Sequence, residues 1–132
     1  MSEHLKQLKI FLAIGIGGMI GAASRYGISI GFPVTNKLPI ETLIANLIGC
    51  FLLSYLLHVP FMKNTFSKES RIGITTGILG AFTTFSTFAV ETVVLGEVSI
   101  LLATGYVIIS LIGGITLCFC GYWMANRRRE SI

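Results

Sequence analysis

Four apolar stretches dominate this chain, and each is long enough to cross a lipid bilayer. A membrane-spanning α-helix needs about 20 predominantly apolar residues, and 132 residues leave room for four such segments with short connections. The composition agrees, since 53% of the residues are hydrophobic, 12% are charged and the mean hydropathy is +0.81. Soluble domains carry about 25% charged residues. The sequence therefore predicts an all-α integral membrane protein.

Prolines and charges set the boundaries of the predicted spans. Pro33, Asn36 and Pro39 mark the loop after the first span, and Pro60 ends the second, because prolines interrupt helices. A basic loop over residues 61–71 then leads into the third span. The predicted transmembrane helices cover residues 8–32, 40–59, 72–95 and 99–124, in one domain of residues 1–132.

The placement of positive charge predicts the orientation. Eight of the ten Lys and Arg residues fall before the first span, between the second and third, or after the fourth, which is one side of the membrane. Only Lys37 and Arg25 belong to the other side. Cytoplasmic loops are enriched in Lys and Arg, so both termini are expected in the cytoplasm, with the protein in the cell membrane. The run 127–129 is interpreted as a topology anchor, and no nucleic-acid partner is expected.

Glycines recur at four-residue spacing in the first and third spans. Such pairs allow helix backbones to approach closely in lipid. The pattern, together with Arg25, also favours a retained first helix over a cleaved signal peptide. The pairs are Gly17 and Gly21, Gly27 and Gly31, and Gly73 and Gly77.

Residues 77–88 interrupt the third apolar stretch with glycines, hydroxyls and aromatic rings. Polar groups at membrane depth normally face protein or a water-filled path. Gly80 followed by consecutive threonines predicts a third helix that is broken in mid-membrane, where the freed carbonyls need protein, water or an ion. This segment is the best candidate for a conducting surface.

Polar or aromatic side chains on three predicted helices share a helix face. The pairs are Thr42 and Asn46, Tyr106 and Ser110, and Phe85 and Phe88. Amide and hydroxyl donors and positive ring edges favour an anion, and donors without fixed charge bind it without trapping it. The surface therefore predicts passage of a small anion, while interhelical hydrogen bonding of Asn46 remains an equal alternative.

Ionisable side chains offer no enzyme site. Glu91 is the most deeply embedded carboxylate, and it is interpreted as capping a polar network, with proton coupling as the alternative. Cys50, Cys118 and Cys120 lack metal-site spacing and are interpreted as packing residues. No catalytic triad, carboxylate pair or phosphate loop is present in the sequence, so enzyme activity is not expected.

Four motifs together resemble the small fluoride channel family (Fluc, also called CrcB). They are GGMIGAASRY at 17–26, NLIG at 46–49, GAFTTFSTF at 80–88 and YVIIS at 106–110. The resemblance covers essentially the whole chain. It implies a passive channel that lets fluoride leave the cytoplasm, built from four-helix subunits that form antiparallel dimers with two pores.

The resemblance also implies roles for individual residues. Asn46 matches the pore asparagine, and Phe85 and Phe88 match the paired pore phenylalanines. A structural sodium ion at the dimer centre would be held by the carbonyls of Gly80 and Thr83. Arg25 is expected at a pore mouth, and the further pore-lining candidates are Thr42, Ser86, Thr87, Tyr106 and Ser110.

Two departures from the family pattern leave alternatives open. Ala81 replaces a glycine common at that position, and the charge bias is stronger than in members that insert both ways. The chain is thus expected to form an antiparallel homodimer or to pair with a homologue of opposite topology. A proton-coupled small-molecule exporter of the small four-helix type is the main functional alternative, although the first span lacks its usual carboxylate. A non-transporting membrane assembly subunit is the third.

Overall fold

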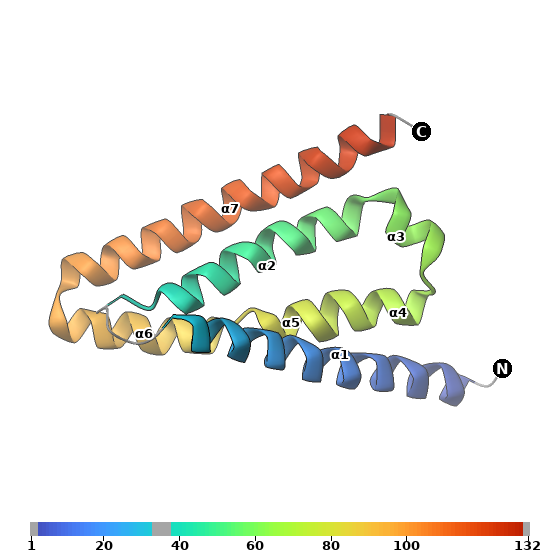
Figure 1. The fold of residues 1–132 in the computed structure, drawn as a ribbon, viewed down its shortest axis with the longest axis horizontal. Helices are drawn as coiled ribbons and strands as arrows, with labels where there is room; N and C mark the ends of the chain where they lie inside the picture. The colour runs from blue at the N-terminus through green and yellow to red at the C-terminus, as the bar shows by residue number, and fades with distance from the viewer. Residues whose placement is uncertain (1–2, 33–37, 131–132) are drawn as a thin grey trace.

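The computed structural model describes residues 3–32 and 38–130, and every regular element in those ranges is helical. Four helical segments there are long and apolar enough to cross a membrane: 3–31, 40–58, 68–98 and 100–127. Figure 1 shows them as an elongated bundle with both chain ends at one end. The predicted class of fold, all-helical with four membrane spans, is confirmed. The expectations for Pro33, Asn36 and Lys37, and for the side chains of Arg128 and Arg129, lie outside the described residues.

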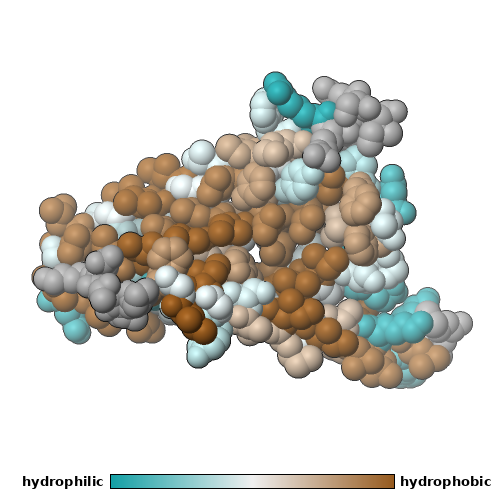
Figure 2. Space-filling model, viewed as in Figure 1, coloured by the Kyte–Doolittle hydropathy of each residue, from teal (hydrophilic) through white to brown (hydrophobic). Residues whose placement is uncertain are grey.

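Three of the four spans are continuous helices: α1 (Glu3–Gly31), α2 (Ile40–His58) and α7 (Ile100–Glu130). Helices α1 and α7 run past the predicted 8–32 and 99–124 into charged turns that lie beyond the apolar segments. Helix α2 ends at His58 because Pro60 cannot continue the helical hydrogen bonds. Apolar residues cover the length of the bundle in Figure 2, and hydrophilic residues gather at its ends.

The third span is assembled from short pieces and is interrupted near its middle. Helix α5 ends at Phe82 and α6 begins at Phe85, while Thr83 and Thr84 between them are extended, with ψ of 157° and 127°. Residues 61–71, expected to be a loop, instead contain two short helices, because a proline starts one and Ser67 caps the other. The elements are α3 (Pro60–Thr65), α4 (Lys68–Ile72), the π-helical turn η1 (Gly73–Ile78), α5 (Leu79–Phe82) and α6 (Phe85–Val98).

Glycines bring α1 against the π-helical turn. A Cβ at Gly17 would overlap the carbonyl oxygen of Gly73, and a Cβ at Gly21 would overlap that of Ile78. The expected close approach therefore occurs between the first and third spans. The pair Gly27 and Gly31 differs, since a Cβ there meets no atom within 4 Å among the described residues.

Helix α2 packs along α7, and α6 packs against the first half of α7. Two small buried clusters mark these contacts. One contains Val59, Met62 and Ala125, and the other contains Leu95, Ala103 and Tyr106. The second cluster lies beside Phe88, so it anchors the helix that follows the break.

Candidate functional site

Asn46 on α2 is bonded to the break in the third span. Its Nδ2 donates to the Thr84 carbonyl at 2.9 Å, and its Oδ1 accepts from the Thr84 N–H at 2.8 Å. One side chain thus satisfies both polar groups of an extended residue that has no helical partner of its own. The hydrogen-bonding alternative for Asn46 is present in the structure, and it also fixes the position of the amide beside the break.

Thr84 is a site residue that the sequence analysis missed. Its hydroxyl caps α6, accepting from the Thr87 N–H at 3.2 Å and donating to Thr87 Oγ1 at 3.1 Å. Threonine is a favoured N-cap because its oxygen satisfies an amide left free in the first turn. The signal that could have identified this cap is the three-residue spacing of Thr84 and Thr87, which follow Gly80 in the sequence.

A cavity of about 380 Å³ is lined by six of the site residues predicted from the sequence. They come from three spans and surround the break. The side chain of Phe85 is 80% exposed in the single chain, and its ring centroid lies 6.0 Å from that of Phe88. The six residues are Asn46, Gly80, Thr83, Phe85, Phe88 and Ser110.

Several hydroxyls at this site already donate to protein groups. Ser110 donates to the Tyr106 carbonyl at 2.7 Å, and Thr83 donates to the Leu79 carbonyl at 2.9 Å. Each of these hydroxyls has a single proton, so it offers a ligand only its lone pairs. The second N–H of Asn46 and the ring edges of the phenylalanines are groups of the cavity lining that can still interact with an anion.

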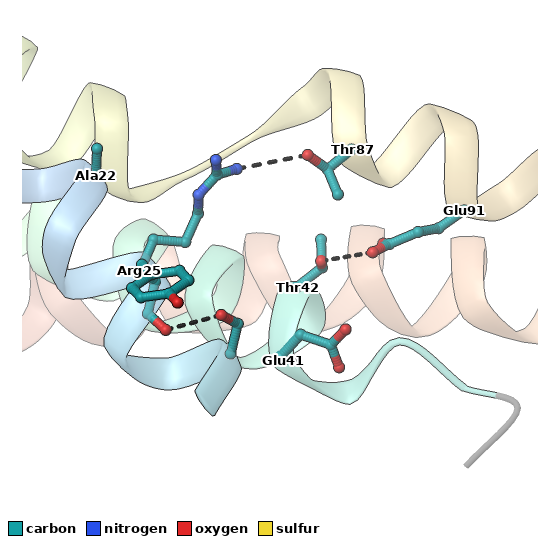
Figure 3. Close-up of a pocket in the computed structure, with 8 residues that line it drawn as sticks. Ala22, Arg25, Glu41, Thr42, Thr87 and Glu91 are labelled. Carbon is teal, nitrogen blue, oxygen red and sulfur yellow. Dashed lines mark hydrogen bonds between the residues drawn. The ribbon is translucent and has the colours of Figure 1, made fainter. Parts of the chain in front are cut away.

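A second cavity, of about 230 Å³, lies where α1, α2 and α6 meet. Figure 3 shows Arg25 extending from α1 toward Thr87, and its Nη1 donates to Thr87 Oγ1 at 3.4 Å. Thr42 faces Glu91 in the same view and donates to it at 2.8 Å. The cavity therefore combines a guanidinium, hydroxyls and the carboxylates of Glu41 and Glu91.

The Glu91 carboxylate is the centre of a polar network. Its second oxygen accepts from the Tyr106 hydroxyl at 2.8 Å, and Tyr106 is only 3% exposed. The Tyr106 ring lies 5.2 Å from the ring of Phe88. Because α2 and α7 each supply one donor, the carboxylate joins both helices to α6, which supports the network interpretation of Glu91.

The predicted pore-lining residues therefore divide between different surroundings. Tyr106 is buried at the network and lies outside the Asn46 cavity. Ser86 is exposed and lines neither cavity, and its Oγ lies 3.3 Å from Thr84 Oγ1. Thr42, Thr87 and Arg25 line the second cavity. Among the described residues, no group of three or more His, Cys, Asp and Glu side chains could hold a metal ion.

Comparison with known proteins decides the family. Residues 12–122 match the family described as "CrcB-like protein, Camphor Resistance (CrcB)". The chain belongs to the CrcB family. The matched range includes every site residue described above. With four helices able to span a bilayer, this member of the CrcB family is a multi-pass protein of the cell membrane.

Curated CrcB relatives match this chain over most of their length. A Chlorobium phaeobacteroides protein named "Fluoride-specific ion channel FluC" is 37% identical, over 92% of this chain and 96% of the relative. "Fluoride-specific ion channel FluC 1" of Bacillus cereus is 41% identical, over 96% of this chain and 91% of the relative. "Fluoride-specific ion channel FluC 2" of Staphylococcus haemolyticus is 46% identical, over 84% of this chain and 92% of the relative. All three relatives are named as ion channels.

Proposed function

We propose that the chain is a fluoride-selective passive channel that exports fluoride from the cytoplasm, and that it is not an enzyme. The observation that carries the proposal is the meeting of an amide, hydroxyls and two aromatic rings at the break of the third span. It occurs in a chain whose relatives are named fluoride-specific ion channels. The same groups favour an anion without supplying the fixed charge that would hold it.

The pore proposed here runs past Asn46, Phe85 and Phe88. The ring edges of the phenylalanines present partial positive charge, and the free N–H of Asn46 donates a hydrogen bond. These groups replace part of the hydration shell of the ion as it passes. The other proposed lining residues are Thr42, Ser86, Thr87, Tyr106 and Ser110, with Arg25 at a pore mouth.

A second protein chain is proposed to cover the break. Gly80 and Ser86 are exposed beside the interrupted backbone, and irregular backbone at membrane depth is tolerated only against protein or a water-filled cavity. An antiparallel dimer with two pores would satisfy this requirement in the lipid bilayer. The partner is a second copy, or a homologue of opposite topology if the charge bias fixes this chain with its termini in the cytoplasm.

The residues of the break fit a structural sodium ion at the centre of that dimer. The Thr84 N–H, which would close a helical bond to Gly80, is donated to Asn46 Oδ1. The Thr87 N–H, which would bond the Thr83 carbonyl in a regular helix, is donated to Thr84 Oγ1. Both carbonyls thus lose their helical donors and are available as oxygen ligands, which a hard cation prefers. The ion would supply positive charge between the two protomers.

A proton-coupled exporter is the competing function, and the geometry does not favour it. The first span carries no carboxylate between Glu3 and its end at Gly31. The carboxylate of Glu91 is engaged by two hydroxyls. A carboxylate bonded in this way links α2 and α7 to α6.

Purified protein in liposomes loaded with potassium fluoride and potassium chloride provides the test. Valinomycin allows potassium to leave, and ion-selective electrodes record each anion. Release of fluoride without chloride is expected. The protein expressed alone could release neither ion and yet release fluoride after coexpression with a paired homologue, and that result would support the heterodimer. No release of fluoride in either case would reject the channel.

A further inference from the structure

A third cavity lies between the end of α2 and the two short helices α3 and α4, and it shares one lining residue, Thr75, with the Asn46 cavity. Its volume is about 240 Å³. Figure 1 shows α3 and α4 at the end of the bundle that also carries both chain ends. This end is rich in Lys and Arg, and α2 and the third span leave the apolar region here. The cavity therefore lies at the boundary between the membrane core and the aqueous side.

Three cations line this cavity. Lys63 is on α3, and Lys68 and Arg71 are on α4. Lys63 and Lys68 are exposed, and Arg71 is partly buried. Among the described residues, no carboxylate forms an ion pair within 4 Å with Lys63, Lys68 or Arg71, so these three charges are not neutralised by a contacting carboxylate.

The wall of the cavity is largely apolar. It is formed mainly by Leu56 and Leu57 at the end of α2 and by Ile72 at the end of α4. Thr75 adds one hydroxyl, whose proton is donated to the Arg71 carbonyl. Met62, which also lines the cavity, is 4% exposed and packs with Val59 and Ala125. A site for a free anion alone would be lined mainly by polar groups. Cations next to an apolar wall instead match a molecule with an anionic head and a hydrocarbon chain.

We propose that this cavity binds the headgroup of an anionic phospholipid in the membrane leaflet next to this end of the bundle. Lys63, Lys68 and Arg71 hold the phosphate, and the first part of an acyl chain lies along Leu56, Leu57 and Ile72. Basic pockets between membrane helices on the cytoplasmic side bind such headgroups. The proposal does not depend on which ion the chain conducts.

Native mass spectrometry of the full-length protein in detergent tests the site. Dioleoylphosphatidylglycerol and dioleoylphosphatidylcholine are titrated separately, and inorganic phosphate is added in a third arm. The combined variant Lys63→Gln, Lys68→Gln, Arg71→Gln removes the charges. Lys63→Arg, Lys68→Arg, Arg71→Lys keeps them, and Lys6→Gln removes a cation outside the cavity. Circular dichroism checks the helix content of each variant, and Arg71→Gln alone replaces the combined variant if that one does not fold.

The wild type is expected to bind phosphatidylglycerol in preference to phosphatidylcholine. Each neutralised cavity cation should weaken phosphatidylglycerol binding about fivefold, whereas the charge-conserving variant and Lys6→Gln should retain it. Equal binding by the wild type and the neutral variant would overturn the proposal. So would an equal loss in Lys6→Gln, which indicates general surface charge, or displacement of the lipid by inorganic phosphate at similar concentration, which indicates a site for a free anion.

Discussion

Asn46 is hydrogen-bonded to both main-chain polar groups of Thr84, at 2.8 Å to the N–H and 2.9 Å to the carbonyl. The amide that faces the proposed pore is therefore also the group that holds the helix break. The same bond withholds the Thr84 N–H from Gly80, whose carbonyl is a proposed sodium ligand. Substitution of Asn46 should affect stability as well as conduction, and each quantity needs its own measurement.

Asn46→Asp should lose fluoride flux and stability together. The carboxylate cannot donate to the Thr84 carbonyl, and its charge repels an anion in the pore. Breaking the pairing should lower the free energy of unfolding by about 1–3 kcal/mol. Liposome efflux and thermal unfolding in detergent measure the two effects. Asn126→Asp on α7 is the control, and normal flux in Asn46→Asp would remove this residue from the pore.

Phe85→Ile should reduce fluoride flux without affecting folding. The ring is 80% exposed in the single chain, so its removal costs little packing within the protomer, but the positive ring edge is lost. We expect at least about a tenfold loss, which corresponds to about 1.4 kcal/mol of lost ion stabilisation. Phe119→Ile, at a 69% exposed ring on α7, should leave efflux unchanged; equal losses in the two variants would point to a general effect in lipid.

The sequence was informative wherever a local pattern determines structure. Hydropathy and Pro60 locate the spans, because a bilayer requires long apolar helices. The hydroxyls and glycines of 77–88 mark the interrupted third span, because they are anomalous in lipid. The short helices α3 and α4 were missed, because a single proline or capping serine within a basic segment is also typical of a loop.

Pairings between distant segments could not be read from the sequence. Asn46 and Thr84 are far apart in the chain. Periodicity placed Asn46 on a helix face without naming its partner, and it gave no role to Thr84. The convergence of Thr42 and Tyr106 on Glu91 likewise depends on how α2 and α7 pack. The π-helical turn arises where the third span contacts Gly17 of α1, which is again a property of packing.

Gly49→Ala should displace the break, and a second substitution should restore it. A methyl group at position 49 would overlap Cγ2 of Thr83. Thr83→Ser removes that methyl group and keeps the hydroxyl that bonds Leu79. We expect reduced stability and flux in Gly49→Ala and substantial recovery in the double variant. Gly15→Ala, where the added carbon meets no described atom within 4 Å, is the control. Additive losses in the double variant would contradict the steric explanation.

Tyr106→Phe should destabilise the protein through Glu91. It removes the donor to one carboxylate oxygen inside the bundle, at a residue that is 3% exposed. Leaving that oxygen without its partner should reduce the free energy of unfolding by about 1–3 kcal/mol. Thermal unfolding measures the effect, with Tyr122→Phe on the exposed side of α7 as the control. An unchanged unfolding temperature would show that the network contributes no stability.

Glu91→Gln separates a channel from a proton-coupled exporter. The amide can accept from one of the two hydroxyls and donate to the oxygen of the other, so the variant should fold and keep α2 and α7 joined to α6. A passive channel needs no titrating group, and fluoride efflux should persist in this variant with the same response to an imposed pH gradient as in the wild type. Efflux at matched and opposed pH gradients is the measurement, with circular dichroism as the check on folding. Complete loss of transport in a folded variant, together with proton-driven transport in the wild type, would favour the exporter over the channel.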